Sequence, residues 1–488
     1  MPPIRELSPA EEVLGNVQAE LAAHFDLAGY DACLRKLLDG GGQRSVPIDM
    51  SQFERPLDFP GFPPGFQPHF YQRYPGDVQG NIRPTRTELL GTSDGRPLFD
   101  KREDRHPYVR SFKARGALLV ALDILSRRPD VRTFVTHSSG NHARGVVAAV
   151  HMLNAALVES GLVRVDEYGD VDSRDAGNLF RAEIYCGRDI DPGKRLALLD
   201  NGASVHDEFE TLEAAGLQAA ARAERAGVAA IHPFDTDIVI AGQETLGLEL
   251  LLDLAQQGVD LRATPVALRV AVGGGGLYAG QQAAFDHAIQ AGLLHPESRV
   301  IAVEAENNDS TNRELCGLEP LTARTLSQVA GGIATLQSGR RGVAAVGGYS
   351  PGGVRVVNEA YMILAAAQLA RTNGGVPPEF AGTLSLASLL MDRDEGLIDP
   401  IQSGVDVVIR CGGNASPAVL LELATKHETH EDARVEEAAR YLGPAAFRIL
   451  SRDALEPSLA PLRIADRPVR ANVRTPLRVI ACPFSGSK

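Results

Sequence analysis

The chain of 488 residues has no tryptophan, few aromatic residues and only five cysteines. The cysteines are Cys33, Cys186, Cys316, Cys411 and Cys482, and they lie far apart with no CxxC pair among them. Neither a disulfide framework nor a zinc site is indicated by an odd number of cysteines at such spacings. Isolated thiols of this kind fit a reducing cytoplasm.

Positive charge is also scarce. The chain carries 49 Lys and Arg against 62 Asp and Glu, which gives a formal net charge of −13. Nucleic acids and acidic membrane surfaces are bound by clustered cations, which this balance does not supply. No stretch approaches the apolar length of a membrane span, and the N-terminal sequence is charged where a secretory signal needs an apolar core. We therefore expect a cytoplasmic protein that acts on a small molecule and binds neither nucleic acid nor membrane.

Hydrophobic residues make up 44% of the chain, which is enough for two domains with buried cores. Residues Met50 to Pro84 are rich in proline and aromatic residues and predict an irregular wrap. Further along, short apolar runs alternate with longer helical ones, a pattern typical of α/β proteins with a mostly parallel sheet. Strands are expected at Val131 to Thr136, Val266 to Val272 and Val405 to Arg410. Each is followed by a glycine-containing turn, where ligands of such sheets collect.

The second of these turns contains four consecutive glycines, Gly273 to Gly276. Without side chains, their backbone N–H groups can approach one anion at the start of the following helix, so we expect a phosphate site. The same stretch satisfies GxGxxA through Gly274, Gly276 and Ala279, and Glu304 ends a later strand-like run. A dinucleotide site, and with it a nicotinamide-dependent dehydrogenase, therefore stays open as an alternative.

The first turn, THSSGNH, is rich in polar residues. Backbone N–H groups at such a helix start can bind a carboxylate, while a hydroxyl or amide faces the reacting carbon. One residue of the turn is also expected to cap the helix. His142, at its end, receives no role in proton transfer.

Lys113 lies at the start of a predicted helix, within YVRSFKARGALL. A lysine and a phosphate site together suggest pyridoxal 5′-phosphate, with the lysine as its Schiff-base partner and nearby positive charge lowering the pKa of the amine. On this residue alone, a solvated surface lysine is the simpler interpretation.

Taken together, the segments resemble the fold type II pyridoxal-phosphate enzymes, specifically the threonine/serine dehydratase and serine racemase group. The resemblance extends from about Arg83 to Ala418. It rests, in order, on the segments RPTRTELL, LFDKRED, SFKARGA, THSSGNH, HPFDTDIVIAGQETLGLELL, VGGGGL, PEFAGTLSLASLL and CGGN. It implies two open, mostly parallel α/β domains with the cofactor in the cleft between them. The large domain would comprise residues 83–128 and 236–430 and the small, mobile domain residues 129–235, with extensions at 1–82 and 431–488.

The same resemblance implies roles at the cofactor. Lys113 would form the Schiff base and Phe112 would pack beside the ring. Asn141 would contact the ring oxygen, Ser139 would act on the substrate, and Cys411 would face the pyridine nitrogen. The phosphate would be bound by Gly273, Gly274, Gly275, Gly276 and Leu277.

Further residues would bind the substrate or line its pocket. Ser138, Gly140 and His142 are expected to hold the substrate carboxylate, and Glu379 is a pocket candidate. Arg110 stands where the family usually has a small residue, so its guanidinium either reaches a second acid group of the substrate or points to solvent. No metal is expected, because Ser310 occupies the position of the family's last metal ligand.

A thiol at Cys411 would leave the pyridine nitrogen largely neutral, and this weaker electron sink suits elimination or racemisation better than transamination. We therefore expect an ammonia-lyase, or dehydratase, that converts a β-hydroxy or other β-substituted amino acid into a 2-oxo acid and ammonia. A β-replacement synthase and an amino-acid racemase remain alternatives. A homodimer is expected. The extra polar sequence VESGLVRVDEYGDVDSRDAGN would lengthen the small domain.

Overall fold

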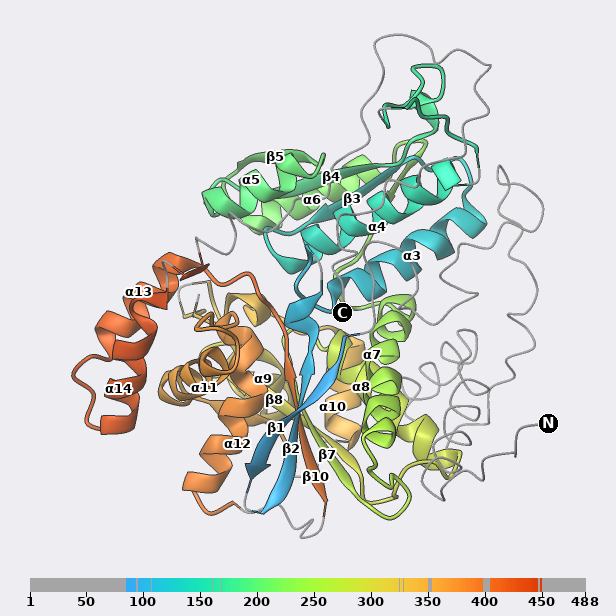
Figure 1. Cartoon of the computed structure of the whole chain (residues 1–488). Helices are drawn as coiled ribbons and strands as arrows, with labels where there is room; N and C mark the ends of the chain where they lie inside the picture. Colours follow the sequence, from blue (N-terminus) through green and yellow to red (C-terminus); the bar gives the residue numbers. More distant parts are fainter. Residues whose placement is uncertain are drawn as a thin grey trace, which may run out of the picture.

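A computed structural model describes residues 85–449, except 94, 107, 160, 168, 324, 328, 350–352, 398–403 and 446–447. The predicted wrap at Met50 to Pro84 lies outside the described residues. The described chain forms two separate sheets, each covered by helices (Figure 1).

The larger sheet has six strands, and only its first two are antiparallel. Its order is β1 (Thr87–Ser93), β2 (Arg96–Arg102), β10 (Val405–Arg410), β7 (Val266–Ala271), β8 (Arg299–Ala305) and β9 (Arg355–Val357). The parallel strands β10, β7 and β8 are largely buried and mostly apolar, and they lie between covering helices, as parallel strands normally do.

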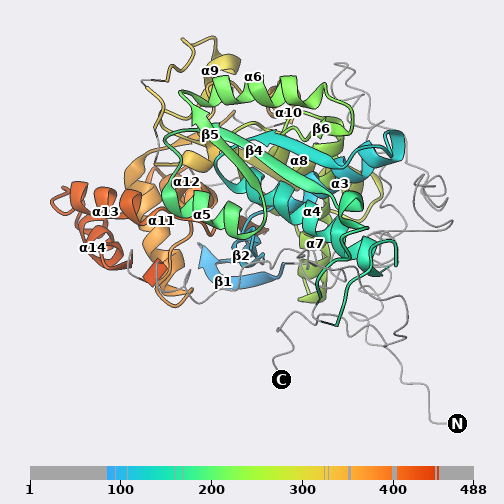
Figure 2. The same cartoon turned by 90° about the horizontal axis from the view of Figure 1, so that it is seen from above.

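The smaller sheet has four strands, all parallel, and comes from one continuous part of the chain. Its order is β5 (Ser204–Phe209), β4 (Arg181–Gly187), β3 (Thr133–His137) and β6 (Val228–Ala230). It is associated with α4 (Asn141–Glu159), α5 (Pro192–Asp200) and α6 (Leu212–Ala223), as Figure 2 shows from above. This partition of the strands supports the predicted domain boundaries, which stay a proposal.

The remaining helices belong mainly to the larger sheet. They are α7 (Asp237–Gln256), α8 (Gly276–Gln290), α9 (Ser310–Cys316), α10 (Arg340–Tyr349), α11 (Glu359–Arg371), α12 (Leu384–Asp394), α13 (Pro417–Lys426) and α14 (Ala433–Leu442). Of the helices in the described part of the chain, none combines the length and the apolar character needed to cross a membrane.

Helix α3 (Lys113–Arg127) joins the two halves of the fold, because it packs against α4 on one side and α7 on the other (Figure 1). The contact with α7 is made at glycines. A Cβ atom placed on Gly242 would lie 2.6 Å from the Cα of Gly116, so neither helix can carry a side chain there at this spacing. This close contact therefore fixes the position of Lys113, the first residue of α3, between the two sheets.

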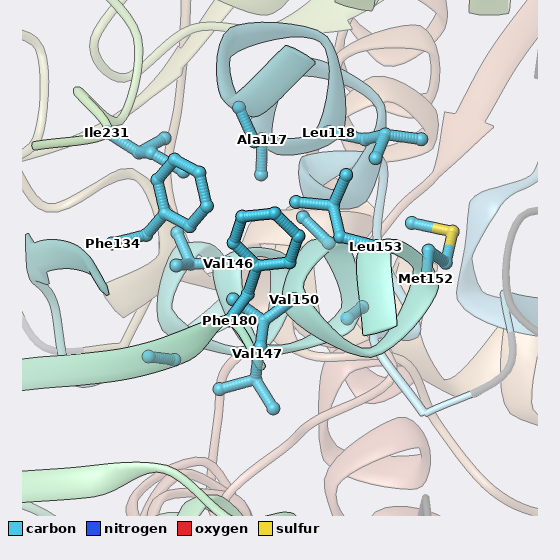
Figure 3. Close-up of a cluster of buried hydrophobic side chains, with 14 of the residues drawn as sticks. Ala117, Leu118, Phe134, Val146, Val147, Val150, Met152, Leu153, Phe180 and Ile231 are labelled. Atoms are coloured by element: carbon cyan, nitrogen blue, oxygen red, sulfur yellow. The ribbon is translucent and has the colours of Figure 1, made fainter. Parts of the chain in front are cut away.

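A hydrophobic core fills the space around α3, α4 and the smaller sheet (Figure 3). Phe134 of β3 and Phe180 lie with ring centroids 6.0 Å apart, against Val146 and Val150 of α4. The alanine- and valine-rich stretch of α4 allows the helix to approach the sheet closely. These contacts fix the position of the turn between β3 and α4.

The sequence predictions of strands agree well with these elements. Val405 to Arg410 coincides with β10, and Val266 to Val272 extends one residue beyond β7. The strand predicted at Val131 to Thr136 begins two residues later, at Thr133. The predicted α/β class with mostly parallel sheets is confirmed.

A buried ion network connects β2, α3 and α7. Arg115 donates to both oxygens of Glu249, at 2.7 Å each, and to both oxygens of Glu103, at 3.0 and 3.2 Å. Lys101 adds a second cation, 3.1 Å from Glu249. All four side chains are almost fully buried. Because charges in such surroundings are tolerated only when paired, the network fixes the first turn of α3.

Replacing Arg115 by Met should therefore leave two carboxylates facing each other with too little positive charge. We expect a loss of about 3–5 kcal/mol in the free energy of unfolding, measured by urea denaturation. Arg127→Met is the matched control, because Arg127 pairs with Asp123 at the exposed end of the same helix. It should cost less than about 1 kcal/mol. Equal losses of unfolding free energy in the two variants would contradict the stabilising role of the buried ion network.

Candidate active site

A cavity opens at the carboxyl ends of β7 and β10, beside the start of α3. It is formed by the turns that follow these strands, the start of α4, and two further loops. Its lining residues are Phe112, Lys113, Asn141, Pro233, Phe234, Val239, Gln243, Ala271, Gly273, Gly274, Gly275, Gly276, Leu277, Gly332, Ile333, Glu379, Ala381 and Cys411. Carboxyl ends of parallel strands are where ligands of open α/β sheets bind.

Lys113 is the first residue of α3 and points into the cavity. Its Nζ donates a hydrogen bond to the carbonyl oxygen of Pro233 at 3.0 Å and lies 5.0 Å from the centre of the Phe112 ring. Burial lowers the pKa of this amine to about 8, although Cys411 and Glu379 act in the opposite direction. The predicted cause, the flanking arginines, is therefore wrong. Lys113 becomes a weaker base because it is removed from water.

The glycine loop lies between β7 and α8, opposite Lys113. Gly275 adopts φ +85°, which disfavours any residue with a side chain. A Cβ atom on Gly274 would lie 2.1 Å from the Phe234 ring, and one on Gly276 would lie 2.6 Å from the Phe234 carbonyl oxygen. The loop therefore presents only main-chain atoms, at the positive end of α8, as an anion site requires.

Asn141 is the residue of the THSSGNH turn that the described structure brings to the cavity wall. Its Nδ2 donates to Oε1 of Glu379 at 2.6 Å, and its Oδ1 accepts from Nδ2 of Asn414, also at 2.6 Å. Ser138 accepts a hydrogen bond from the backbone N–H of Gly140 and shapes the turn. The predicted roles of Ser138, Ser139 and Gly140 toward the substrate stay predictions.

His142 is buried behind this turn. Its Nε2 lies 3.1 Å from the carbonyl oxygen of Ile231, which attaches the start of α4 to the end of β6. Burial lowers the pKa of the imidazole to about 3, with a further contribution from the Lys113 charge. The ring is therefore neutral, and its observed contact is structural. Its predicted part in holding the substrate carboxylate stays a prediction.

Glu379 and Cys411 both face the cavity. Burial raises the pKa of the Glu379 carboxyl, and the backbone N–H of this residue donates to the carbonyl oxygen of Gly412 at 2.7 Å. Burial likewise raises the pKa of the Cys411 thiol well above its ordinary value, although the backbone of Phe112 acts against this. The sequence predicted a neutral thiol at position 411, next to a pyridine nitrogen that carries no proton.

Arg110 does not point to solvent, so this interpretation of the sequence is wrong. The side chain is buried, and its Nη1 donates to the carbonyl oxygen of Gly413 at 3.3 Å. Its own carbonyl oxygen accepts from the N–H groups of Gly412 and Gly413, at 3.1 and 2.9 Å. With φ of +50°, Arg110 holds a strained conformation that these bonds stabilise. Its contacts support the loop after β10, and the predicted contact with a second acid group of the substrate stays a prediction.

Several cavity residues were not predicted. Pro233 and Phe234 belong to HPFD, which was quoted only for the family resemblance. Asn414, which contacts the lining residue Asn141, belongs to CGGN but received no role. Ile333 reaches the cavity from a loop without a motif, whereas Ala381 belongs to PEFAGTLSLASLL, in which only Glu379 was given a role. The motifs HPFD and CGGN were signals that could have identified Pro233, Phe234 and Asn414.

Glu304 has a different role from the one that a dinucleotide site requires. Its two carboxylate oxygens accept from the backbone N–H groups of Thr311 and Asn312, at 2.9 Å each, and so cap α9. The carboxylate is thereby engaged at a helix start rather than presented to a ribose. In the described part of the chain, no group of three His, Cys, Asp or Glu side chains is placed to hold a metal.

A partly buried lysine opposite a glycine loop, in a fold with two mostly parallel sheets covered by helices, defines a pyridoxal-phosphate site of fold type II. The sequence pattern of the family described as "Pyridoxal-phosphate dependent enzyme" matches residues 78–158 and 174–409, more than half of the chain. The chain belongs to this family, and its cofactor is pyridoxal phosphate. The gap between the two matched parts lies within the extra polar sequence noted above.

Named relatives agree with this assignment. The chain is 32% identical over 252 residues to a mitochondrial threonine dehydratase of Schizosaccharomyces pombe, a match that spans 51% of this chain but only 35% of that protein. It is 29% identical to an L-threonine ammonia-lyase of Geobacter sulfurreducens, over 68% of this chain and 72% of that one.

Solved structures give the same picture. The processed form of threonine deaminase isoform 2 from Solanum lycopersicum matches with a TM-score of 0.56 and 25% identity, covering 70% of this chain and 86% of that chain. A threonine deaminase from T.th. matches with a TM-score of 0.51 and 30% identity, covering 67% of this chain and 93% of that chain. The predicted family, fold type and cofactor are confirmed.

The residues of the site fit this cofactor. The glycine loop would hold its phosphate, Lys113 would hold its aldehyde carbon, and the neutral Cys411 thiol suits an unprotonated ring nitrogen. Each of these groups faces the same cavity.

The lowered pKa of Lys113 predicts how the cofactor-free protein captures pyridoxal phosphate. Only the neutral amine attacks a carbonyl, so the rate of capture should rise about tenfold per pH unit below pH 8 and level off above it. Borohydride trapping at a series of pH values, followed by quantification of the Lys113 peptide, measures this rate. A rate that keeps rising to about pH 10 would indicate an ordinary exposed lysine.

Proposed function

We propose that this protein is a pyridoxal-phosphate-dependent ammonia-lyase. It would remove the β-hydroxyl or another β substituent from an amino acid and release a 2-oxo acid and ammonia. The observation that carries the proposal is the neutral thiol of Cys411, partly buried and placed in the same cavity as Lys113. The names of the threonine dehydratase and ammonia-lyase relatives support it.

When bound, pyridoxal phosphate withdraws electrons from the α-carbon of an amino acid and so acidifies its proton. The amine of Lys113, with a pKa of about 8, is suited to accept that proton and return it near neutral pH. The Cys411 thiol would face the ring nitrogen without keeping it protonated, so the bound cofactor would be a weaker electron sink. Expulsion of the β substituent is then favoured over transamination. Ser139 is the proposed acid that assists the leaving group.

We further propose that the enzyme works in the cytoplasm as a homodimer. The cysteines in the described residues, Cys186, Cys316 and Cys411, are all free thiols, which suits a reducing compartment. Analytical ultracentrifugation of the purified protein at several concentrations tests the oligomeric state.

A screen of amino acids tests the activity directly. β-Hydroxy and other β-substituted amino acids are incubated with the holoenzyme, and ammonia and 2-oxo acid are quantified. Lys113→Ala should lower the turnover by at least about 10³-fold, because the proton acceptor is lost. Lys426→Ala, which removes a surface lysine paired with Glu359, should have no effect.

Three other outcomes would contradict the proposal. Turnover that requires an added nucleophile would indicate a β-replacement synthase, and inversion at the α-carbon without ammonia release would indicate a racemase. A colourless protein that binds a nicotinamide cofactor would indicate a dehydrogenase.

Substitution of Cys411 tests the role of the thiol. Cys411→Ser keeps a neutral group and should retain elimination activity within about tenfold, a change of about 1.4 kcal/mol in the barrier. Cys411→Asp should protonate the ring nitrogen, lower elimination and convert part of the cofactor to its amine form. Absorbance spectra during turnover measure that conversion. An Asp variant with unchanged elimination and no amine form would contradict the proposed role.

A further inference from the structure

Asn414 lies beside the cavity, at the end of the loop that follows β10. Its Nδ2 donates to two oxygens, the backbone carbonyl of Val109 at 2.9 Å and Oδ1 of Asn141 at 2.6 Å. The two bonds come from one nitrogen, and one of the two acceptors is a main-chain atom. These two bonds determine the orientation of the side-chain amides of Asn414 and Asn141, that is, which end of each amide is the oxygen and which is the nitrogen.

The direction of the hydrogen bonds follows from the Val109 carbonyl. A carbonyl oxygen can only accept, so the atom of Asn414 that faces it must be the amide nitrogen. That same nitrogen faces Asn141, so the facing atom of Asn141 must be its oxygen. The other end of Asn141 is then its amide nitrogen, which lies 2.6 Å from Oε1 of Glu379.

We propose that Asn414 is a positioning residue that fixes Asn141 as a hydrogen-bond donor toward the cofactor cavity. The amide nitrogen of Asn141 has two hydrogens, and the bond to Glu379 uses one. The second is available to an acceptor in the cavity, and the ring oxygen of pyridoxal phosphate is such an acceptor. The inference rests on the cofactor site and is independent of which reaction the enzyme catalyses.

The oxygen of Asn414 supports this orientation. Among the described residues, Oδ1 of Asn414 is buried without a hydrogen-bond partner. An unpaired buried acceptor is unfavourable, because it loses its bonds to water and gains none in return. Reversing the amide would be worse, because its oxygen would then face two other oxygens. The unpaired oxygen is thus the consequence of an orientation dictated by Val109 and Asn141.

The same bonds join parts of the chain that are distant in sequence. Asn141 begins α4, beside the smaller sheet, whereas Glu379 and Asn414 belong to loops at the larger sheet. Val109 precedes the lysine of α3 and lies between Tyr108 and Arg110, both with positive φ. Asn414 therefore connects the segment that bears Lys113 with the residue that would face the cofactor ring.

A double-mutant cycle in the cofactor-free protein tests the inference. The dissociation constant for pyridoxal phosphate is measured by fluorescence for the wild type, Asn414→Ala, Asn141→Ala and the double variant. If Asn414 acts through Asn141, Asn414→Ala should weaken binding about 5–10-fold in the wild type and less than about twofold in the Asn141→Ala background. Equal weakening in both backgrounds would overturn the proposal.

Asn414→Asp gives an independent spectroscopic readout. A carboxylate cannot donate to Val109 or Asn141, so Asn141 should turn its nitrogen toward residue 414 and its oxygen toward the cavity. The absorbance band of the bound cofactor should then shift, as it should in Asn141→Ala. An unchanged band in Asn414→Asp, together with a shifted band in Asn141→Ala, would overturn the proposal.

Two controls separate positioning from folding. Asn154→Ala removes an amide that also makes paired bonds, to the backbone of Phe180, but lies beside the smaller sheet. It should lower the melting temperature without changing the cofactor spectrum. If Asn414→Ala does not fold, Asn414→Ser replaces it in the cycle. None of these measurements needs turnover of an amino acid, so they remain valid whether or not the enzyme is a lyase.

Discussion

The site depends on the pairing of one buried charge, the guanidinium of Arg115. Glu103 follows β2 and Glu249 belongs to α7, so the arginine can be neutralised only when the sheet and both helices are in place. Because Arg115 lies two residues after Lys113, this pairing also determines where the reactive amine enters the cavity. The lysine is then far enough from water for its pKa to fall to about 8. The buried ion network and the lowered pKa of Lys113 thus have one origin.

The strands and the main motifs could be predicted because they depend on local patterns. Buried β-branched runs indicated the positions of β7 and β10, and consecutive glycines identified the loop before α8. Lys113 could not be predicted from its own neighbours, since nothing local distinguishes it from a surface lysine. The order of motifs far away in the sequence led to its prediction as the Schiff-base lysine.

Other features of the site could not be predicted, for physical reasons. The pKa of Lys113 depends on burial by residues far away in the sequence, so the neighbouring arginines were the wrong explanation. The position of Arg110 depends on a strained backbone that only the loop after β10 stabilises. Ile333 reaches the cavity through packing alone, which leaves no pattern in the sequence. Long-range contacts of this kind are invisible until the chain is folded.

The bond between Asn414 and the carbonyl of Val109 has a consequence for how such a pocket can diversify. The acceptor belongs to the main chain, so a change of the side chain at position 109 does not remove it. A loop that contributes only packing to the cavity wall, such as the one bearing Ile333, can change in size and shape independently. Selection could therefore alter which substrate side chain fits while the donor that faces the cofactor keeps its polarity. The residues that orient the donor toward the cofactor and the residues that shape the substrate pocket thus lie in separate parts of the chain, and only the second group can change freely.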